Sequence, residues 1–147
     1  MKNTTPEHPP RFRFEKLDVG QDARRLNRET YGLSQVFSVE ELHALTSQAR
    51  RAAVSISANI AEGSGRNSDR DFARFLEQSY GSAMELASHL YLARDLGYLS
   101  VQSLESALDH VHHLAIRIAA LNRSLGVGAS KTRLARPSTL DSRPSTS

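Results

Sequence analysis

Apolar residues recur at three- and four-residue steps in four successive blocks between residues 17 and 125. Because an α-helix completes a turn every 3.6 residues, this spacing collects the apolar side chains on one face of each block. At most one short segment of the chain has the alternating pattern of a β-strand, and a single strand has no partner with which to form a sheet. The repeat therefore predicts an all-α fold built from four amphipathic helices.

Capping residues and glycines set the expected ends of the first two helices. The first helix is expected over about residues 17–36. Ser38 and Glu41 have the spacing of a capping box, in which each side chain bonds a free backbone N–H, so the second helix is expected to begin there. Gly63 and Gly65 are expected to end the second helix.

The last two helices carry similar signals. Ser68, followed by Asp71, is a capping signal for the third helix, which Gly97 ends. Ser100 starts the fourth helix, and Gly126 ends it. Helices of about 20–27 residues are about 30–40 Å long at 1.5 Å per residue. Short connections between them make neighbouring helices antiparallel. The expected architecture is an antiparallel up-down-up-down four-helix bundle.

The stretch RRAAVSISANIAEGSGR, residues 50–66, has an ambiguous local pattern. Val54, Ile56 and Ile60 alternate with polar residues, as in a half-buried strand. The same stretch also continues a longer helical repeat that includes Leu45. We interpret it as part of the second helix.

Composition narrows the class of protein. A chain of 147 residues suits one domain, and 39% hydrophobic with 24% charged residues is typical of a globular fold. No apolar run approaches the roughly 18–20 residues that span a bilayer. The chain has no cysteine, which excludes disulfides and thiolate metal sites, and its first residues lack the apolar core of a secretory signal. We therefore expect a cytoplasmic protein without membrane association.

The positive charge of the chain is concentrated in its terminal segments. The sequence pI is about 9.6 and the net charge is +3. Residues 1–13 carry a net +2 and residues 126–147 a net +3, which leaves −2 on residues 14–125. Both terminal segments lack apolar periodicity, so we expect two disordered tails, the second basic and rich in Ser, Pro and Arg, around one bundle domain over residues 14–125.

Five arginines are the candidate nucleic-acid-binding residues. Arg66, Arg70 and Arg74 recur every four positions, so they are expected on one face at the start of the third helix, with Arg50 and Arg51 one helix earlier. Such a stripe suits successive phosphates. The alternative is a solvated face on which acidic neighbours neutralise the arginines. These acidic residues are Glu62, Asp69, Asp71 and Glu77.

Two glycine-containing segments have open interpretations. Gly63, Ser64 and Gly65 could hold an anion on backbone N–H groups, but no Walker motif follows, and a plain turn is the alternative. Gly81, beside Ser82, lies in the middle of the third helix, where it weakens the helix unless another backbone comes close. That neighbour could belong to the same bundle or to another subunit.

No catalytic or metal-binding set emerges from the sequence. A carboxylate di-metal bundle needs two Glu-x-x-His pairs, and only Glu40 with His43 fits. His110, His112 and His113 are expected to be surface or partly packed residues. No nucleophile motif is present. We therefore expect a protein that is not an enzyme and has no metal or cofactor.

Four segments together resemble a known family. They are FEKLDV at 14–19, LTSQARRAAVSISANIAEGSGR at 45–66, FARFLEQSYGSAMEL at 72–86 and LARDLGYL at 92–99. This combination resembles the four helix bundle proteins known as the 23S rRNA-intervening sequence protein family. The resemblance covers about residues 14–125.

The resemblance implies a small cytosolic bundle that assembles as a homopentamer. The family is related to the accessory variability determinant proteins of diversity-generating retroelements. This relation implies a basic surface that binds nucleic acid, and it implies a reverse transcriptase as a possible protein partner. The resemblance also implies that the segment around Arg50, Arg51, Asn59, Glu62 and Arg66 matters for structure or binding, with no catalysis and no cofactor.

The chain departs from the family at two informative positions. Ser57 stands where the family commonly has a proline, so the second helix is expected to be straighter. Tyr80 stands where the family is often basic. The sequence favours a non-enzymatic homo-oligomer that binds structured RNA or DNA. A protein scaffold is the alternative, and a metal-binding bundle is a remote one.

Overall fold

The computed structural model describes residues 8–41 and 43–128. Within these residues the structure contains helices and no strand, which confirms the all-α class. Most of the two predicted tails falls outside the described residues. The elements are η1 (Arg13–Lys16), α1 (Asp18–Ser34), η2 (Val39–Glu41), α2 (Leu45–Ser64), α3 (Asp69–Asp95) and α4 (Val101–Ser124).

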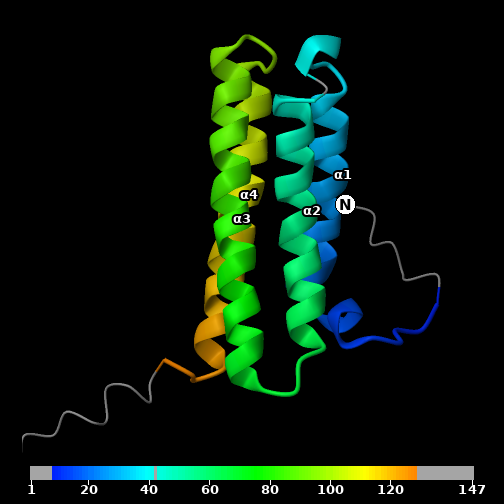
Figure 1. Cartoon of the computed structure of the whole chain (residues 1–147), viewed down its shortest axis with the longest axis vertical. Coiled ribbons are helices and arrows are strands. Elements are labelled where there is room, and N and C mark those ends of the chain that lie inside the picture. The colour runs from blue at the N-terminus through cyan, green and yellow to red at the C-terminus, as the bar shows by residue number, and fades with distance from the viewer. Residues whose placement is uncertain (1–7, 42, 129–147) are drawn as a thin grey trace, which may run out of the picture.

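The four long helices lie side by side along the long axis of the molecule (Figure 1). Contacts join α1 to α2, α2 to α3, α3 to α4 and α4 back to α1. The α2–α3 connection lies at the lower end in Figure 1, and the α1–α2 and α3–α4 connections lie at the upper end. In the part of the chain that the structure describes, no helix combines the length and apolar composition needed to cross a membrane.

The helical interpretation of residues 50–66 is confirmed over most of its length, because α2 continues to Ser64. Ile56 and Ile60 are fully buried, whereas Val54 is 45% exposed. Alternation would have placed these three residues on the same face, so the burial follows the helical repeat. The core around them combines alanines with larger side chains. The largest fully buried ones are Phe72, Leu26, Ile56, Ile60, Leu76, Leu86, Leu90, Leu114, Ile118 and Val111.

The expected caps of α3 and α4 are present. The Ser68 hydroxyl accepts a hydrogen bond from the Asp71 N–H at 3.1 Å, and Ser100 accepts one from the Ser103 N–H at 3.1 Å. Gly97 follows α3 with a φ of +84°, a left-handed conformation that glycine adopts without strain. These contacts satisfy free backbone groups at the helix ends, as the sequence pattern predicts.

The predicted start of α2 at Ser38 is wrong. Ser38 leads into the short η2, and α2 begins only at Leu45. The Ser38 hydroxyl lies 3.2 Å from the Tyr98 hydroxyl in the α3–α4 connection, so it makes a tertiary contact and does not cap a helix. Glu41 accepts a hydrogen bond from the Leu45 N–H at 3.3 Å, four residues further along the chain.

The predicted role of Gly63 as a helix terminator is also wrong, because Gly63 lies inside α2 and is buried. A Cβ atom at this position would lie 2.6 Å from the Cβ of Phe75 on α3. Gly63 therefore allows α2 and α3 to approach closely. Gly65 caps α2 with a right-handed φ of −88°.

Candidate nucleic-acid interface

The five predicted arginines divide into two groups at opposite ends of α2. Arg50 and Arg51 lie in its first turns, and Arg66 follows its last residue. At 1.5 Å per residue, Arg50 and Ser64 are about 20 Å apart along the helix. Arg66 belongs to the α2–α3 connection, so only Arg70 and Arg74 share α3. The two groups therefore do not form one continuous stripe.

At the α2–α3 end, two arginines carry acidic partners. Arg66 pairs with Glu62 at 2.8 Å, and Arg74 lies 3.7 Å from Asp71. Both guanidinium groups also stack on the ring of Phe75, with centroid distances of 4.7 and 5.5 Å. This arrangement corresponds to the neutralised surface that the sequence analysis keeps as an alternative.

Two further arginines complete this end of the bundle. Arg70 is exposed on the first turn of α3. Arg13 of η1, which sequence reasoning missed, places its guanidinium 4.8 Å from the centroid of Phe72. Phe72 and Phe75 are 1% and 7% exposed, so neither ring offers a platform on which nucleic-acid bases could stack.

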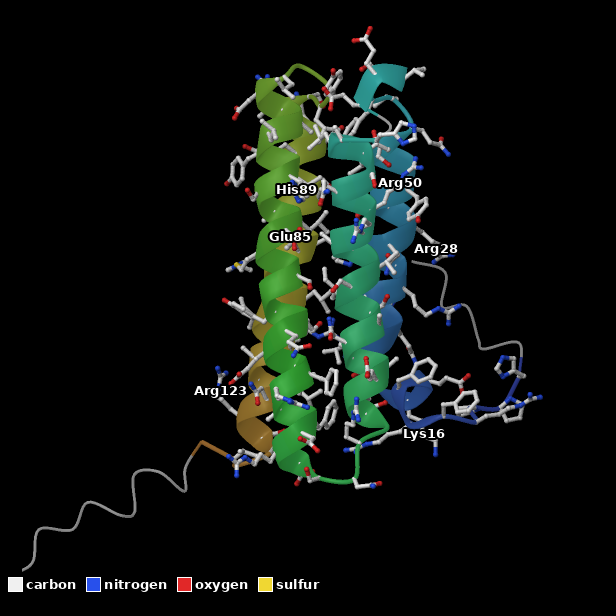
Figure 2. All side chains as sticks on the ribbon, viewed as in Figure 1. Lys16, Arg28, Arg50, Glu85, His89 and Arg123 are labelled. Carbon is white, nitrogen blue, oxygen red and sulfur yellow. The ribbon has the colours of Figure 1, made fainter. Side chains whose placement is uncertain are left out.

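At the other end, Arg50 is held between α1 and α2 (Figure 2). Its Nε donates a hydrogen bond of 2.8 Å to the hydroxyl of Ser34, and its guanidinium lies 4.6 Å from the ring centroid of Tyr31. Neither partner carries a negative charge, so Arg50 keeps its full charge in a fixed orientation. Arg51, the next residue, is exposed.

Arg50 and Arg51 border an open hollow of about 710 Å³. The described residues that line it include no Asp or Glu. Sequence reasoning considered His43 only as a metal ligand and missed Tyr31, because their proximity depends on how α1 packs against α2. The lining residues are Tyr31, His43, Thr46, Ser47, Arg50, Arg51, Val54 and Ser55.

The glycine segment at the end of α2 is a turn. Gly63 and Ser64 belong to the helix, and the N–H groups of Gly65 and Arg66 donate to the carbonyls of Glu62 and Gly63 at 3.1 Å. Those two N–H groups are therefore used within the turn, as the alternative to an anion cradle predicts.

A network of polar side chains that includes Asn59 and Ser82 joins α2 to α3. The Asn59 amide donates to the backbone carbonyl of Ser55 at 2.9 Å and to its hydroxyl at 3.0 Å. That hydroxyl lies 2.8 Å from the Ser82 hydroxyl, and Ser79 donates to the carbonyl of Ile56 at 2.9 Å. These residues have a structural role in the subunit. Gly81, in contrast, would place a Cβ atom in open space, so the close neighbour is not found within the described bundle.

A second polar cluster joins α1 to α4. His110 lies 2.5 Å from Glu29 through Nδ1 and 3.1 Å from Asp22 through Nε2. Arg117 also contacts Asp22, at 3.1 Å. The hydrogen bond to Glu29 raises the pKa of His110 above its ordinary value, with burial opposing this and Asp22 adding to it.

The cluster could have been found from spacing, because Asp22 and Glu29 are seven residues apart on one helix, and so are His110 and Arg117 on another. Residues seven apart lie on the same helix face. The two carboxylates contact different nitrogens of the imidazole ring and do not converge on one point. Among the described residues, no group of three or more His, Asp or Glu side chains could hold a metal ion.

Fold and site together define a four-helix protein with arginine-rich surfaces at two ends of one helix. The family model described as 23S rRNA-intervening sequence protein matches residues 15–120. The chain therefore belongs to this family, which confirms the resemblance seen in the sequence.

One solved structure has a similar fold. It is a protein with unknown function from the S23 ribosomal protein family of Bacteroides thetaiotaomicron VPI-5482. The alignment covers 71% of this chain and 97% of that chain, with 22% identity and a TM-score of 0.65. At this identity the similarity supports the fold alone. No curated protein matches this chain.

Proposed function

We propose that this protein is a non-enzymatic, homo-oligomeric bundle that binds structured RNA or DNA through its surface arginines in the cytoplasm. The proposed subunit is an antiparallel up-down-up-down bundle, and the proposed assembly is a homopentamer. It needs no cofactor, because the role is recognition of a polyanion.

The observation that carries this proposal is the hollow beside Arg50 and Arg51. Arginine presents a planar fork that matches a phosphate group. Arg50 is already oriented by Ser34 and Tyr31, so binding would cost little further side-chain entropy. A phosphate in this hollow would meet two arginines and no carboxylate among the described lining residues, while Glu85 lines an adjoining hollow with Arg51.

Assembly would strengthen contacts that are weak in one subunit. The outer side of α3 exposes Tyr80, Met84 and Tyr91 by 40%, 42% and 55%. These residues share one helix face next to Gly81, which has open space above it. Exposed apolar patches commonly mark protein interfaces. A ring of copies would present each arginine group several times, which raises avidity.

Fluorescence anisotropy with a labelled RNA duplex tests the proposal. The full chain should bind with an affinity that falls steeply as salt increases, because phosphate contacts release counterions. A combined Arg50→Gln and Arg51→Gln variant should bind more weakly and with a flatter salt dependence. A variant with Arg66, Arg70 and Arg74 replaced by Gln should lose less affinity, because two of these arginines have acidic partners.

The contribution of the basic tail is measured separately in the full chain. Replacing the four tail cations by Gln tests whether binding depends on the tail alone. These cations are Lys131, Arg133, Arg136 and Arg143. Loss of all binding in this variant would contradict a phosphate-binding surface on the bundle.

The second candidate function is a protein scaffold, which the exposed apolar face of α3 favours. Its partner would be a protein, such as a reverse transcriptase by family relation. A scaffold would retain its partner in a pull-down after nuclease treatment and would show no affinity for the RNA duplex. The two candidate functions therefore give opposite results in the anisotropy experiment.

A further inference from the structure

The charged residues of α1 are sorted onto two sides of the helix. Asp18, Asp22 and Glu29 fall within a sector of about 40° when successive residues are rotated by about 100°. Asp22 and Glu29 contact α4, so this acidic sector faces the α1–α4 seam. Arg24 and Arg28 lie about 120° and about 80° from the nearer edge of this sector. The acidic residues of α1 and these two arginines therefore lie on different sides of the helix.

Arg24 and Arg28 extend the surface on which Arg50 lies. Tyr31, whose ring contacts the Arg50 guanidinium, lies on nearly the same face of α1 as Arg24. Figure 2 shows Arg28 and Arg50 at successive levels on the same side of the molecule. We call Arg24, Arg28, Tyr31 and Arg50 the α1–α2 basic face.

The arginines of this face have no acidic partner among the described residues. The ion pairs of α1 in this part of the chain use Arg25, His110 and Arg117, which contact Asp22 or Glu29. Arg24 and Arg28 are exposed, and Arg50 contacts only a hydroxyl and an aromatic ring. Their positive charge is therefore available to a ligand.

The spacing of the face suits a run of phosphates. Arg50 meets α1 at the level of Ser34, which is about 15 Å along the helix axis from Arg24. One strand of a duplex advances about 3.4 Å along the duplex axis per phosphate, so α1 lying parallel to that axis would span about four phosphates. Three arginines along it could contact up to three of them.

The aromatic content of the face argues against a single-stranded ligand. Sequence-tolerant binding of single strands uses successive aromatic side chains on which bases stack. Tyr31 is the one aromatic member of this face, and the Arg50 guanidinium already lies over its ring. The face therefore offers charge to a backbone and no row of stacking sites.

We propose that the α1–α2 basic face binds the sugar-phosphate backbone of a nucleic-acid double helix, without base-specific contacts. This inference rests on the proposed function and assigns it to residues of α1 that the sequence analysis did not select. It also makes Arg24 and Arg28 more important for binding than Arg66 and Arg74, whose charges are partly compensated.

The test compares four forms of the full chain, using DNA and RNA duplexes of about 20 base pairs and a single strand of the same length. The forms are the natural protein, the Arg24→Gln, Arg28→Gln variant, the Arg24→Lys, Arg28→Lys variant, and an Arg94→Gln, Arg123→Gln control. The control removes the same charge from α3 and α4. Circular dichroism confirms equal helix content before binding is measured.

The expected result is that the natural protein binds both duplexes more tightly than the single strand. The Arg24→Gln, Arg28→Gln variant should bind about tenfold more weakly near 0.1 M salt. Its slope of log affinity against log salt for the DNA duplex should fall by about 2, because two phosphate contacts are lost. The control should retain affinity within about twofold, and Arg24→Lys with Arg28→Lys should keep most of the slope, because the charges remain.

The possible failures are distinguishable. If the natural protein binds a duplex and the Arg24→Gln, Arg28→Gln variant binds it equally well, the proposed role of the α1–α2 basic face is overturned. The proposed function then stands. Absence of binding by the natural protein overturns both. Equal or tighter binding to the single strand overturns recognition of a double-helix backbone.

Discussion

His110 of α4 lies between two carboxylates of α1, with Nδ1 2.5 Å from Glu29 Oε2 and Nε2 3.1 Å from Asp22 Oδ1. A neutral imidazole has one N–H donor and one acceptor nitrogen, whereas the charged imidazolium donates from both. Two carboxylate acceptors therefore require the charged form. This relationship ties the α1–α4 seam to the protonation of one side chain.

The stability of the protein should decrease as pH rises through the titration of His110. The hydrogen bond to Glu29 raises the pKa of folded His110 above the unfolded value of about 6.5. The stabilisation is therefore complete below the unfolded pKa and is lost as pH rises through the folded pKa. Urea unfolding at several pH values and one protein concentration measures this change.

Substitution of His110 gives the matched control for this pH dependence. His110→Gln should flatten the change in unfolding free energy over this pH range and cost about 1–3 kcal/mol at low pH, because charge-assisted hydrogen bonds are lost. His112→Gln, at an exposed neighbouring position, should retain the pH profile of the natural protein. If the His110→Gln variant keeps the pH dependence of the natural protein's unfolding free energy, protonation of His110 does not stabilise the α1–α4 seam.

Substitution of two helical glycines by alanine should have opposite effects. Gly63→Ala should destabilise the protein by about 1–3 kcal/mol, because its Cβ would lie 2.6 Å from the Cβ of Phe75. Gly81→Ala meets nothing within 4 Å in the subunit and should gain up to about 1 kcal/mol of helix propensity. Thermal unfolding compares the two variants. Destabilisation of the assembly by Gly81→Ala would instead indicate a close neighbour in another subunit.

Removal of the α3 cap should weaken the bundle. Ser68→Ala removes the acceptor for the Asp71 N–H and should cost about 1 kcal/mol. Asn67→Ala, at the exposed preceding position, should change stability by less than about 0.5 kcal/mol. Urea midpoints of the two variants measure the difference, and equal midpoints would mean that this cap contributes nothing.

A charge on the outer face of α3 should disrupt the proposed oligomer. Met84 is 42% exposed between Tyr80 and Tyr91, so Met84→Glu would place a carboxylate in the expected apolar interface. Light scattering coupled to gel filtration should show a lower mass for this variant. Val39→Glu, at a residue of η2 that is 87% exposed, should leave the mass unchanged. A full-sized Met84→Glu oligomer would move the subunit contacts to another face.

The sequence predicted features that depend on local spacing. The caps at Ser68 and Ser100 and the arginine pairs with Glu62 and Asp71 join residues three or four positions apart. Such contacts follow from helix geometry alone. Ser38 had the same local signal, yet its hydroxyl contacts Tyr98, sixty positions away, and helix α2 starts later.

Features that depend on how helices pack were not predictable from one helix at a time. Gly63 has the composition of a helix end, but the Phe75 side chain on α3 determines its role. The contacts of Arg50 with Ser34 and Tyr31 likewise require the alignment of α1 against α2. The arginines and the acidic partners of Arg66 and Arg74 could be selected from sequence, whereas the uncompensated charge of Arg50 between α1 and α2 could not.

The hydroxyl contacts between α2 and α3 also fix the longitudinal alignment of these helices. A slip of one helix turn would move the partners about 5.4 Å apart. The buried Ser79 hydroxyl would then lose the Ile56 carbonyl, and Gly63 would no longer lie opposite Phe75. An alanine-rich, smooth packing surface would tolerate such sliding, but an unpaired buried hydroxyl and a steric clash make it costly. These contacts between α2 and α3 therefore hold Arg70 and Arg74 of α3 at a fixed axial position relative to Arg50 and Arg51 of α2.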